Sequence, residues 1–443
     1  MPSSPRSTSA ALLGPVVRPL QRFLRLQAAS GILLLAGAVA AMVWANLDYA
    51  GYDGLFERAR TVVAGGLGVR FSLRTLINDG LMTVFFLVVG MEIKRELVVG
   101  ELDTAAKASL PAIAALGGML LPATIFLAIN RGHPGRVGWG IPMATDIAFC
   151  VGVLTLLGDR VPRALVVFVT ALAIFDDIGG ILVIALFYGD GIHAGWLLAV
   201  AALCAGLLAM NRLYVRTGIA WAVATAVVWT SVEHAGIHSA ISGVIVGLAI
   251  PARARRPSRR VLEELGDHVR SLERKPPDEE LEGAEIAMIE RKLEQLQAPL
   301  GRLVRLLHPF VAFVVMPLFA LANTGVAIGQ AGAASLGGRV ALGAGLGLLV
   351  GKPLGIFGFT RLAVRLELAP MPGGATVAQL FGVAIVAGIG FTVALFIAAL
   401  AFAEAPRLLE QAKLGILMGS TAAGIGGYLL LRVVGRRDGA RAR

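Results

Sequence analysis

Residues 165–188 read LVVFVTALAIFDDIGGILVIALFY, an apolar stretch interrupted near its middle by two adjacent carboxylates, Asp176 and Asp177. The stretch exceeds the roughly 20 residues that a helix needs to cross the hydrocarbon core of a bilayer. A carboxylate at the centre of such a helix costs about 2.5 to 3.5 kcal/mol on insertion scales. No stability argument favours two of them, so the pair predicts a functional site inside a membrane-spanning helix.

Composition extends the same reading to the whole chain. Of its 443 residues, 56% are hydrophobic and 16% charged, and the mean hydropathy is +0.76. These values are typical of multispanning membrane proteins and exclude a water-soluble fold. We expect an all-α polytopic membrane protein with about twelve transmembrane helices. The expected spans cover residues 28–46, 76–92, 109–129, 139–158, 164–188, 194–211, 217–233, 237–250, 306–327, 338–358, 377–402 and 411–434.

Charge distribution predicts the orientation and the domain order. The net charge is +11, and most Lys and Arg residues between spans fall on one side, which predicts cytoplasmic termini and no nucleic-acid partner. The expected parts are a cytoplasmic segment with an interfacial helix (1–27), spans one to eight (28–250), a charged cytoplasmic insert (251–305), spans nine to twelve (306–434) and a basic cytoplasmic tail (435–443). Neither the cysteines nor the histidines have metal-ligand spacing, so no cofactor is expected.

Two spans contain helix-breaking residues. The fourth includes GWGIPMATDIAF, with Pro142 ahead of Thr145 and Asp146, and the eleventh includes VAGIGFTVALF, with two glycines ahead of Thr392. Interrupted helices in the two halves of a transporter leave backbone groups and half-helix ends that line an ion site near the membrane centre. Gly and Pro are also common in ordinary membrane helices, but the acidic residue beside the first break favours a site.

A lysine is another charge expected inside a span. Lys352 lies within LGLLVGKPLGIFGF in the tenth span and has no counterion nearby in sequence. It is a candidate partner for an aspartate, either as a structural salt bridge or as part of the site. Sodium prefers oxygen ligands, and a carboxylate that binds it must first lose its proton. One site that holds either ion and opens alternately to each side would therefore exchange sodium for protons.

Several motifs resemble one known family over nearly the whole chain. The runs FFLVVGMEIKREL, PMATDIAF, ALAIFDDIGG, GIHSAISGVIVG, PLFALANTGV, LVGKPLGI and GIGFT are similar, in order, to the NhaA-type sodium/proton antiporters. The resemblance implies inverted-topology repeats and crossing of the broken fourth and eleventh helices. It also implies that Asp177 is the chief sodium-binding carboxylate and that Asp176 is its partner, paired with Lys352. Asp146 and Thr145 would complete the site and balance the half-helix dipoles.

The resemblance further implies electrogenic export of sodium, and of lithium, from the cytoplasm across a bacterial inner membrane, and it leaves a homodimer open. A charged cluster of the family, associated with its response to alkaline pH, is matched by Glu92, Lys94, Arg95, Glu96 and His308. Val304 and Arg305 depart from the family pattern, which leaves the pH profile open. On spacing alone, the cluster is an ordinary charged helix surface. Three residues rank lower as site candidates: Asp79, His238 and Thr392.

Other functions explain the buried charges less well. An intramembrane aspartyl protease places its two aspartates on different helices, which DDIGG does not. A light-driven pump would use Lys352 to carry retinal, but about twelve spans argue against that fold. The alternative that stays open is a sodium-coupled symporter of an organic solute, which would require a second substrate and move no protons.

Overall fold

The structure is a computed structural model. It describes residues 29–441 apart from 59, 65–66, 101, 190, 192, 330–336 and, except for a few isolated positions, 254–296. The predicted interfacial helix near the N-terminus and most of the predicted insert 251–305 lie outside the described residues.

Long apolar runs form long helices. Eight helices of the described residues are long and apolar enough to cross a membrane. They cover Ala29–Leu47, Leu73–Val99, Ala105–Ile129, Arg163–Phe187, Ala194–Arg212, Pro299–Asn323, Arg339–Arg365 and Pro406–Gly435. Two further pairs of helices pass the same test together but are bent at a short break, by 42° and 45°. These are the predicted fourth and eleventh spans, so a polytopic membrane fold with two interrupted spans is confirmed.

The expected number of twelve spans is not confirmed, because two predicted spans are shorter helices. The prediction over 217–233 corresponds to α9 (Gly218–His234), which has 17 residues. The prediction over 237–250 corresponds to α10 (Ile241–Ala249), which has 9 residues. At 1.5 Å per residue, nine residues rise only about 14 Å, roughly half of the hydrocarbon thickness.

A small β-hairpin is the main departure from an all-helical fold. After α2 (Tyr49–Glu57), strands β1 (Arg60–Ala64) and β2 (Leu67–Phe71) pair antiparallel, with Arg60 opposite Phe71. The expected spans leave this segment between the first two helices, with no strand predicted there. The β-branched run Thr61 to Val63 followed by the Gly-Gly pair in the sequence favours a hairpin, and this signal was overlooked.

The chain forms two compact units, which are described separately. The larger unit comprises Met1–Met82, Ala105–Tyr188 and Val311–Arg443. Beyond the first helix, α2 and the hairpin, its elements are α3 (Leu73–Thr75), η1 (Leu76–Leu81), α5 (Ala105–Ile129), η2 (Pro134–Met143), α6 (Ile147–Leu157), η3 (Gly158–Arg160), α7 (Arg163–Phe187), η4 (Val311–Val315), α14 (Met316–Asn323), α16 (Arg339–Leu346), η5 (Gly347–Gly351), α17 (Lys352–Arg365), α18 (Val377–Val386), α19 (Phe391–Ala401) and α20 (Pro406–Arg441). The predicted basic tail from residue 435 thus begins as a continuation of α20.

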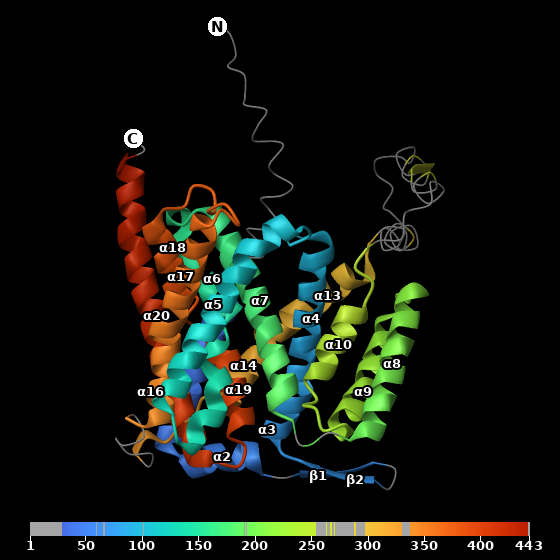
Figure 1. Cartoon of the computed structure of the whole chain (residues 1–443). Coiled ribbons are helices and arrows are strands. Elements are labelled where there is room, and N and C mark those ends of the chain that lie inside the picture. Colours follow the sequence, from blue (N-terminus) through green and yellow to red (C-terminus); the bar gives the residue numbers. More distant parts are fainter. Residues whose placement is uncertain are drawn as a thin grey trace, which may run out of the picture. The chain divides into compact units, whose positions relative to one another are not determined.

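Helices α5 and α17 cross in direct backbone contact in the larger unit (Figure 1). A Cβ placed on Gly355 would lie 2.0 Å from the carbonyl oxygen of Gly117, and one on Gly117 would lie 2.3 Å from the carbonyl oxygen of Gly355. Only glycine at both positions allows this approach, which is the way membrane helices gain packing contacts without a hydrophobic drive between them. The close crossing holds the start of α17, where Lys352 lies, against the bundle.

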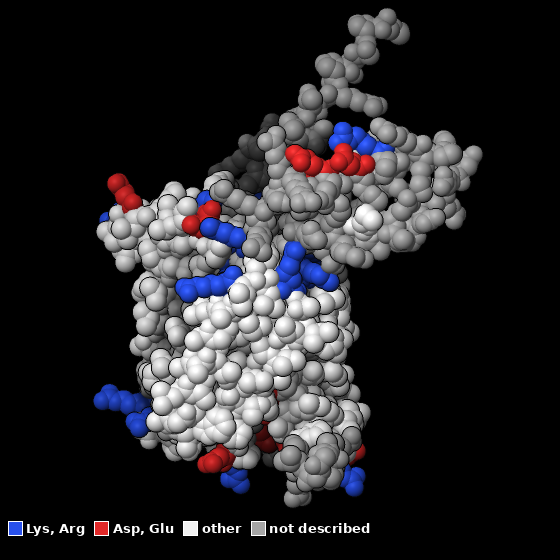
Figure 2. All heavy atoms as spheres, turned by 90° about the vertical axis from the view of Figure 1, so that its right-hand side faces the viewer, with Lys and Arg blue, Asp and Glu red and all other residues white. Residues whose placement is uncertain are grey.

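The smaller unit comprises Thr83–Thr104 and Gly189–Phe310. It contains most of α4 (Met82–Val99), then α8 (Ala194–Arg212), α9, α10 and α13 (Pro299–Phe310). Helix α10 packs closely on α4, where a Cβ on Gly247 would lie 2.6 Å from the carbonyl oxygen of Leu87. The face with α8 and α9 shows a broad band almost without charged side chains, with charges at its two ends (Figure 2). Leu198 and Ile219 in these helices are 74% and 78% exposed, as expected for lipid contact.

Candidate functional site

The two adjacent aspartates lie near the middle of α7. Their residues are 1% exposed for Asp176 and 8% exposed for Asp177, so both carboxylates are buried within a helix of 25 residues. Successive residues of a helix point about 100° apart, so the two carboxylates face different neighbours. Asp176 is the enclosed member of the pair, and Asp177 lies at the edge of the enclosed region.

Lys352 lies beside Asp176. The lysine is 0% exposed, and its Nζ atom is 2.9 Å from Oδ2 of Asp176. The same ammonium group donates a hydrogen bond to the main-chain carbonyl of Met143, the last residue of η2. A buried ammonium group is tolerated only with such partners, because desolvation of an unpaired charge is strongly unfavourable. The structure therefore brings together the two residues that the sequence suggested as partners.

Asp146 connects the two interrupted spans. It is the N-cap of α6, where its Oδ1 atom accepts the Phe149 N–H at 3.2 Å. Its Oδ2 atom accepts the Thr392 N–H at 3.1 Å and the Thr392 hydroxyl at 2.5 Å. Thr392 lies in the first turn of α19, so one carboxylate caps the N-terminal ends of two helices. A negative charge is favourable at each of these positive dipole ends.

Donors meet the opposite, C-terminal ends of the broken helices. The Thr145 hydroxyl lies 3.1 Å from the carbonyl oxygen of Ala387 and 2.5 Å from Oδ2 of Asp176. The Cys150 thiol donates to the carbonyl of Val386 at 3.1 Å, at the end of α18. The Thr145 hydroxyl has one hydrogen, which either oxygen can accept, while the Cys150 thiol and the Lys352 ammonium group donate to carbonyls at helix ends, where intrahelical partners are lacking.

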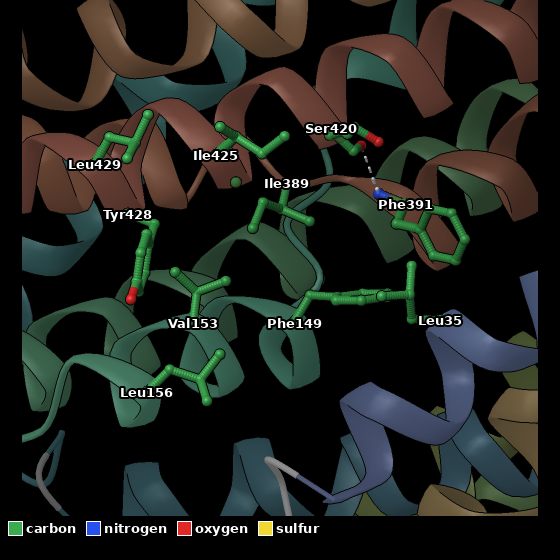
Figure 3. Close-up of a pocket in the computed structure, with 12 residues that line it drawn as sticks. Leu35, Phe149, Val153, Leu156, Ile389, Phe391, Ser420, Ile425, Tyr428 and Leu429 are labelled. Carbon is green, nitrogen blue, oxygen red and sulfur yellow. Dashed lines mark hydrogen bonds between the residues drawn. The ribbon is translucent and has the colours of Figure 1, made fainter. Parts of the chain in front are cut away.

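Ser420 contacts the place where the two interrupted helices meet, which is called the crossing from here on. Sequence analysis missed this residue. From α20, its Oγ accepts the main-chain N–H of Gly390 at 3.2 Å and of Phe391 at 3.3 Å (Figure 3). These N–H groups lie where the chain leaves the break and begins α19. The local sequence LMGSTAAG contains no signal for this contact, since a serine in a membrane helix usually bonds its own backbone. Thr392 was ranked too low for a related reason, because its partner lies 246 residues away.

One buried oxygen atom of this site accepts no hydrogen bond from the described residues. Oδ1 of Asp176 is buried and has no hydrogen-bond partner among the described residues. The crossing places three carboxylates, those of Asp146, Asp176 and Asp177, with one ammonium group, that of Lys352. Carboxylate and carbonyl oxygens are ligands that hard cations prefer. The arrangement therefore has both the ligand type and the negative charge to accept a cation or a proton.

The predicted pH-response residues lie in the smaller unit, on α4 and α13. Nε2 of His308 is 3.9 Å from Oε1 of Glu92, and Arg95 forms an ion pair with Glu96 at 3.0 Å. Lys94 instead donates to the carbonyl of Leu248 at 2.7 Å. Four of the five predicted residues thus form two adjacent charge pairs, while the lysine bonds to the backbone of the α10 region.

The two other lower-ranked residues belong to elements other than the interrupted helices. Asp79 lies in η1, a π-helical turn near the start of the span Leu73–Val99, rather than at a helix cap. His238 precedes α10, and its Nδ1 atom accepts the Ala240 N–H at 3.3 Å. This contact is the local role usual for a polar residue ahead of a helix.

The site consists of two interrupted helices, whose ends are neutralised by buried side chains, and of a carboxylate pair with a lysine. Inside a membrane-spanning bundle, this combination defines the class of ion-coupled secondary transporters. The family model described as Na+/H+ antiporter 1 matches residues 21–431, and the chain belongs to this family. It is 58% identical over 436 residues to a protein named Na(+)/H(+) antiporter NhaA from Anaeromyxobacter sp. strain Fw109-5, an alignment that covers 98% of this chain and 95% of that protein.

Two further relatives have related names and similar coverage. The chain is 53% identical over 433 residues to Na(+)/H(+) antiporter NhaA 1 of Myxococcus xanthus strain DK1622, covering 98% of this chain and 96% of the relative. It is 40% identical over 428 residues to Na(+)/H(+) antiporter NhaA of Sulfurimonas denitrificans, covering 95% and 96%. The resemblance suggested by the sequence motifs is confirmed, and the protein is a multi-pass bacterial membrane transporter.

Proposed function

We propose that this protein exports sodium, and lithium, in exchange for protons by alternating access at the buried aspartates. The observation that carries the proposal is the position of Asp177 beside an ion-paired Asp176, at the crossing of two interrupted helices. The names of the relatives agree with sodium/proton antiport and lend no support to symport of an organic solute.

Exchange follows from competition for the same oxygens. In the proton-loaded state, Asp177 carries a proton and no cation. Sodium binds when that carboxyl releases its proton, because a carboxylate coordinates sodium only in its ionised form. Opening of the loaded site to the other side of the membrane, followed by reprotonation of Asp177, releases sodium. No covalent bond forms or breaks, and no cofactor takes part.

Asp176 and Lys352 form the second proton-linked group in this proposal. In the ion pair, Oδ2 of Asp176 is held by Lys352 and Thr145, whereas Oδ1 has no partner among the described residues. A cation at Asp177 would draw on this oxygen and weaken the attraction between Asp176 and the ammonium group. A proton lost from Lys352 or from Asp176, together with the one lost from Asp177, would make two protons per sodium ion and an electrogenic cycle.

Asp146, Thr145 and Thr392 act as positioning residues in this proposal. Their hydrogen bonds join the end of one broken helix to the start of the other, so they keep the helix ends in register while the site changes access. Their charges and dipoles also reduce the field that the half-helices exert on a bound cation.

We further propose that Glu92, Arg95, Glu96 and His308 tune activity with pH, since the pairing of His308 with Glu92 requires a protonated imidazole. Lys94, bonded to Leu248, contributes positive charge at the same helix end. Val304 and Arg305 lie one turn before His308 and would shift this response relative to relatives with other residues there. The bacterial inner membrane, cytoplasmic termini and a homodimer complete the proposal.

The experiment is sodium-triggered collapse of a pH gradient in everted vesicles, read with a pH-sensitive dye from pH 6.5 to 9. Asp177→Asn should abolish exchange while leaving the protein inserted, because an amide neither binds and releases a proton nor carries the charge for sodium. Asp159→Asn, the same chemical change at an exposed position in η3, should exchange at the wild-type rate. Normal exchange by Asp177→Asn would contradict the site, and no response to sodium in inserted wild type would contradict antiport itself.

A further inference from the structure

A cavity lies beside the crossing of the two interrupted helices. Its volume is about 360 Å³, and α6, α20, the first helix and the break before α19 contribute its lining. Figure 3 shows side chains from these elements surrounding the cavity, among them Leu35, Phe149, Val153, Ile389 and Ile425. Nearly all of the lining is hydrocarbon. An apolar cavity of this kind excludes water and favours an apolar occupant.

The cavity is rimmed by side chains that face outward. Leu35 is 51% exposed, Leu156 69%, Ile425 58% and Leu429 53%. In a membrane-spanning bundle, exposed apolar side chains of this size contact acyl chains. The opening between α6 and α20 is therefore accessible from the lipid phase, and an acyl chain is the apolar molecule present there at high concentration.

Both helices that line the cavity lead to an arginine at the same end. On α20 the cavity is lined by residues spaced along one face of the helix, Gly424, Ile425, Tyr428 and Leu429. The exposed Arg432 lies on the same face, four residues after Tyr428. Beyond Leu156 of α6, the chain reaches Arg160 in η3.

Arg160 packs against α20 near the position of Arg432. A Cβ on Gly435 would lie 2.8 Å from Cβ of Arg160, so Arg160 packs against α20 one turn beyond Arg432. Neither arginine forms an ion pair with another residue in the part of the chain that the structure describes. Two arginines whose backbones lie within about one helical turn of each other along α20, beyond an apolar cavity, provide the positive charge to bind a phosphate group that has an acyl chain attached.

We propose that this cavity and the pair Arg160 and Arg432 bind an anionic phospholipid, with one acyl chain in the cavity and the headgroup phosphate on the arginines. The bound chain contacts the residues that hold Asp146. The carbonyl of Ile389 accepts the Asp146 N–H at 2.7 Å. Phe149 donates its main-chain N–H to the Asp146 carboxylate, and its ring packs on the Phe391 ring at a centroid distance of 5.0 Å. The lipid therefore stabilises the residues that position Asp146 at the crossing.

The test is native mass spectrometry of delipidated full-length protein, titrated with phosphatidylglycerol or with phosphatidylcholine of the same acyl chains. Wild type should bind one phosphatidylglycerol more tightly than any phosphatidylcholine. In the double variant Arg160→Gln and Arg432→Gln, affinity for phosphatidylglycerol should fall about thirtyfold, to the level of phosphatidylcholine, because each arginine near a headgroup contributes about fivefold. The single variant Arg432→Gln, on the exposed helix surface, should show about fivefold.

Matched controls separate this site from general attraction. Arg361→Gln with Arg365→Gln removes the same charge from exposed positions on α17 that do not line the cavity, and should bind as wild type. Ile425→Trp should fill the cavity and weaken binding of both lipids, whereas Val433→Trp, exposed on the same helix outside the lining, should not. Equal binding of the two lipids to wild type, equal losses in both arginine pairs, or unchanged binding in Ile425→Trp would each overturn the proposal.

Discussion

Two sets of charged residues lie in membrane-spanning helices of this protein, and they differ in how completely their charges are enclosed. At the crossing, Asp146, Asp176 and Lys352 are at most 2% exposed and contact partners at 2.5 to 3.2 Å. In the pair on α4 and α13, the side chains of Glu92 and His308 are 23% and 20% exposed, and their charged atoms are 3.9 Å apart.

This difference predicts different consequences of removing a charge. An enclosed charge that loses its partner stays desolvated, which lowers the free energy of unfolding. A partly exposed charge that loses a distant partner is solvated instead, so its removal alters a titration more than the stability. The crossing therefore couples ion binding to the packing of the bundle, whereas the second pair is suited to respond to pH without unfolding its helices.

The largest effect should come from Lys352→Met. This change leaves Asp176 buried without its counterion, and we expect a loss of about 3 to 5 kcal/mol in the free energy of unfolding. Thermal unfolding of the purified protein in detergent measures it. Combining Lys352→Met with Asp176→Asn should restore most of the loss, because no unpaired charge is left. A double variant as unstable as the single one would show that packing of the lysine stem, and not the charge, determines stability at the crossing.

An intermediate effect is expected for Ser420→Ala, which tests whether neutral contacts also hold the crossing. The substitution leaves the buried N–H groups of Gly390 and Phe391 without their acceptor, at a cost of about 1 to 3 kcal/mol. Thermal unfolding again gives the measurement, and the exposed neighbour Thr421→Ala is the matched control. If both alanine variants unfold at the same temperature as wild type, the serine does not stabilise the break in the eleventh span.

The smallest effect on stability should come from His308→Gln, below about 1 kcal/mol, since the pair with Glu92 is long and partly solvated. The ion pair with Glu92 needs a positively charged imidazole, and the glutamine variant cannot supply that charge. We expect the pH at half-maximal exchange to move while the maximal rate stays within about twofold. The dye assay in vesicles measures both. An unchanged pH profile would remove His308 from the pH response.

Much of the site was predictable because charges in apolar spans are conspicuous. Asp176, Asp177 and Lys352 each interrupt a long hydrocarbon run, and Pro142 marks the first break beside Thr145 and Asp146. Thr392 was underrated, and Ser420 was not found, because hydroxyl residues are ordinary in membrane helices and carry no mark of the partner they meet. The count of twelve spans is not confirmed at α10, since hydropathy does not distinguish a full span from a nine-residue helix with apolar flanks.

The sequence by itself determined that the chain crosses a membrane many times, that two spans are interrupted, and which charges are buried in them, because each of these follows from local hydropathy and backbone chemistry. Only the tertiary structure decided that one carboxylate, Asp146, caps two helices, that the ammonium group of Lys352 also binds the carbonyl of Met143, and that α6 and α20 help to line an apolar cavity. The physical reason is that the long-range hydrogen bonds among these contacts join residues 209 and 246 positions apart, and their geometry depends on how helices with close glycine contacts pack.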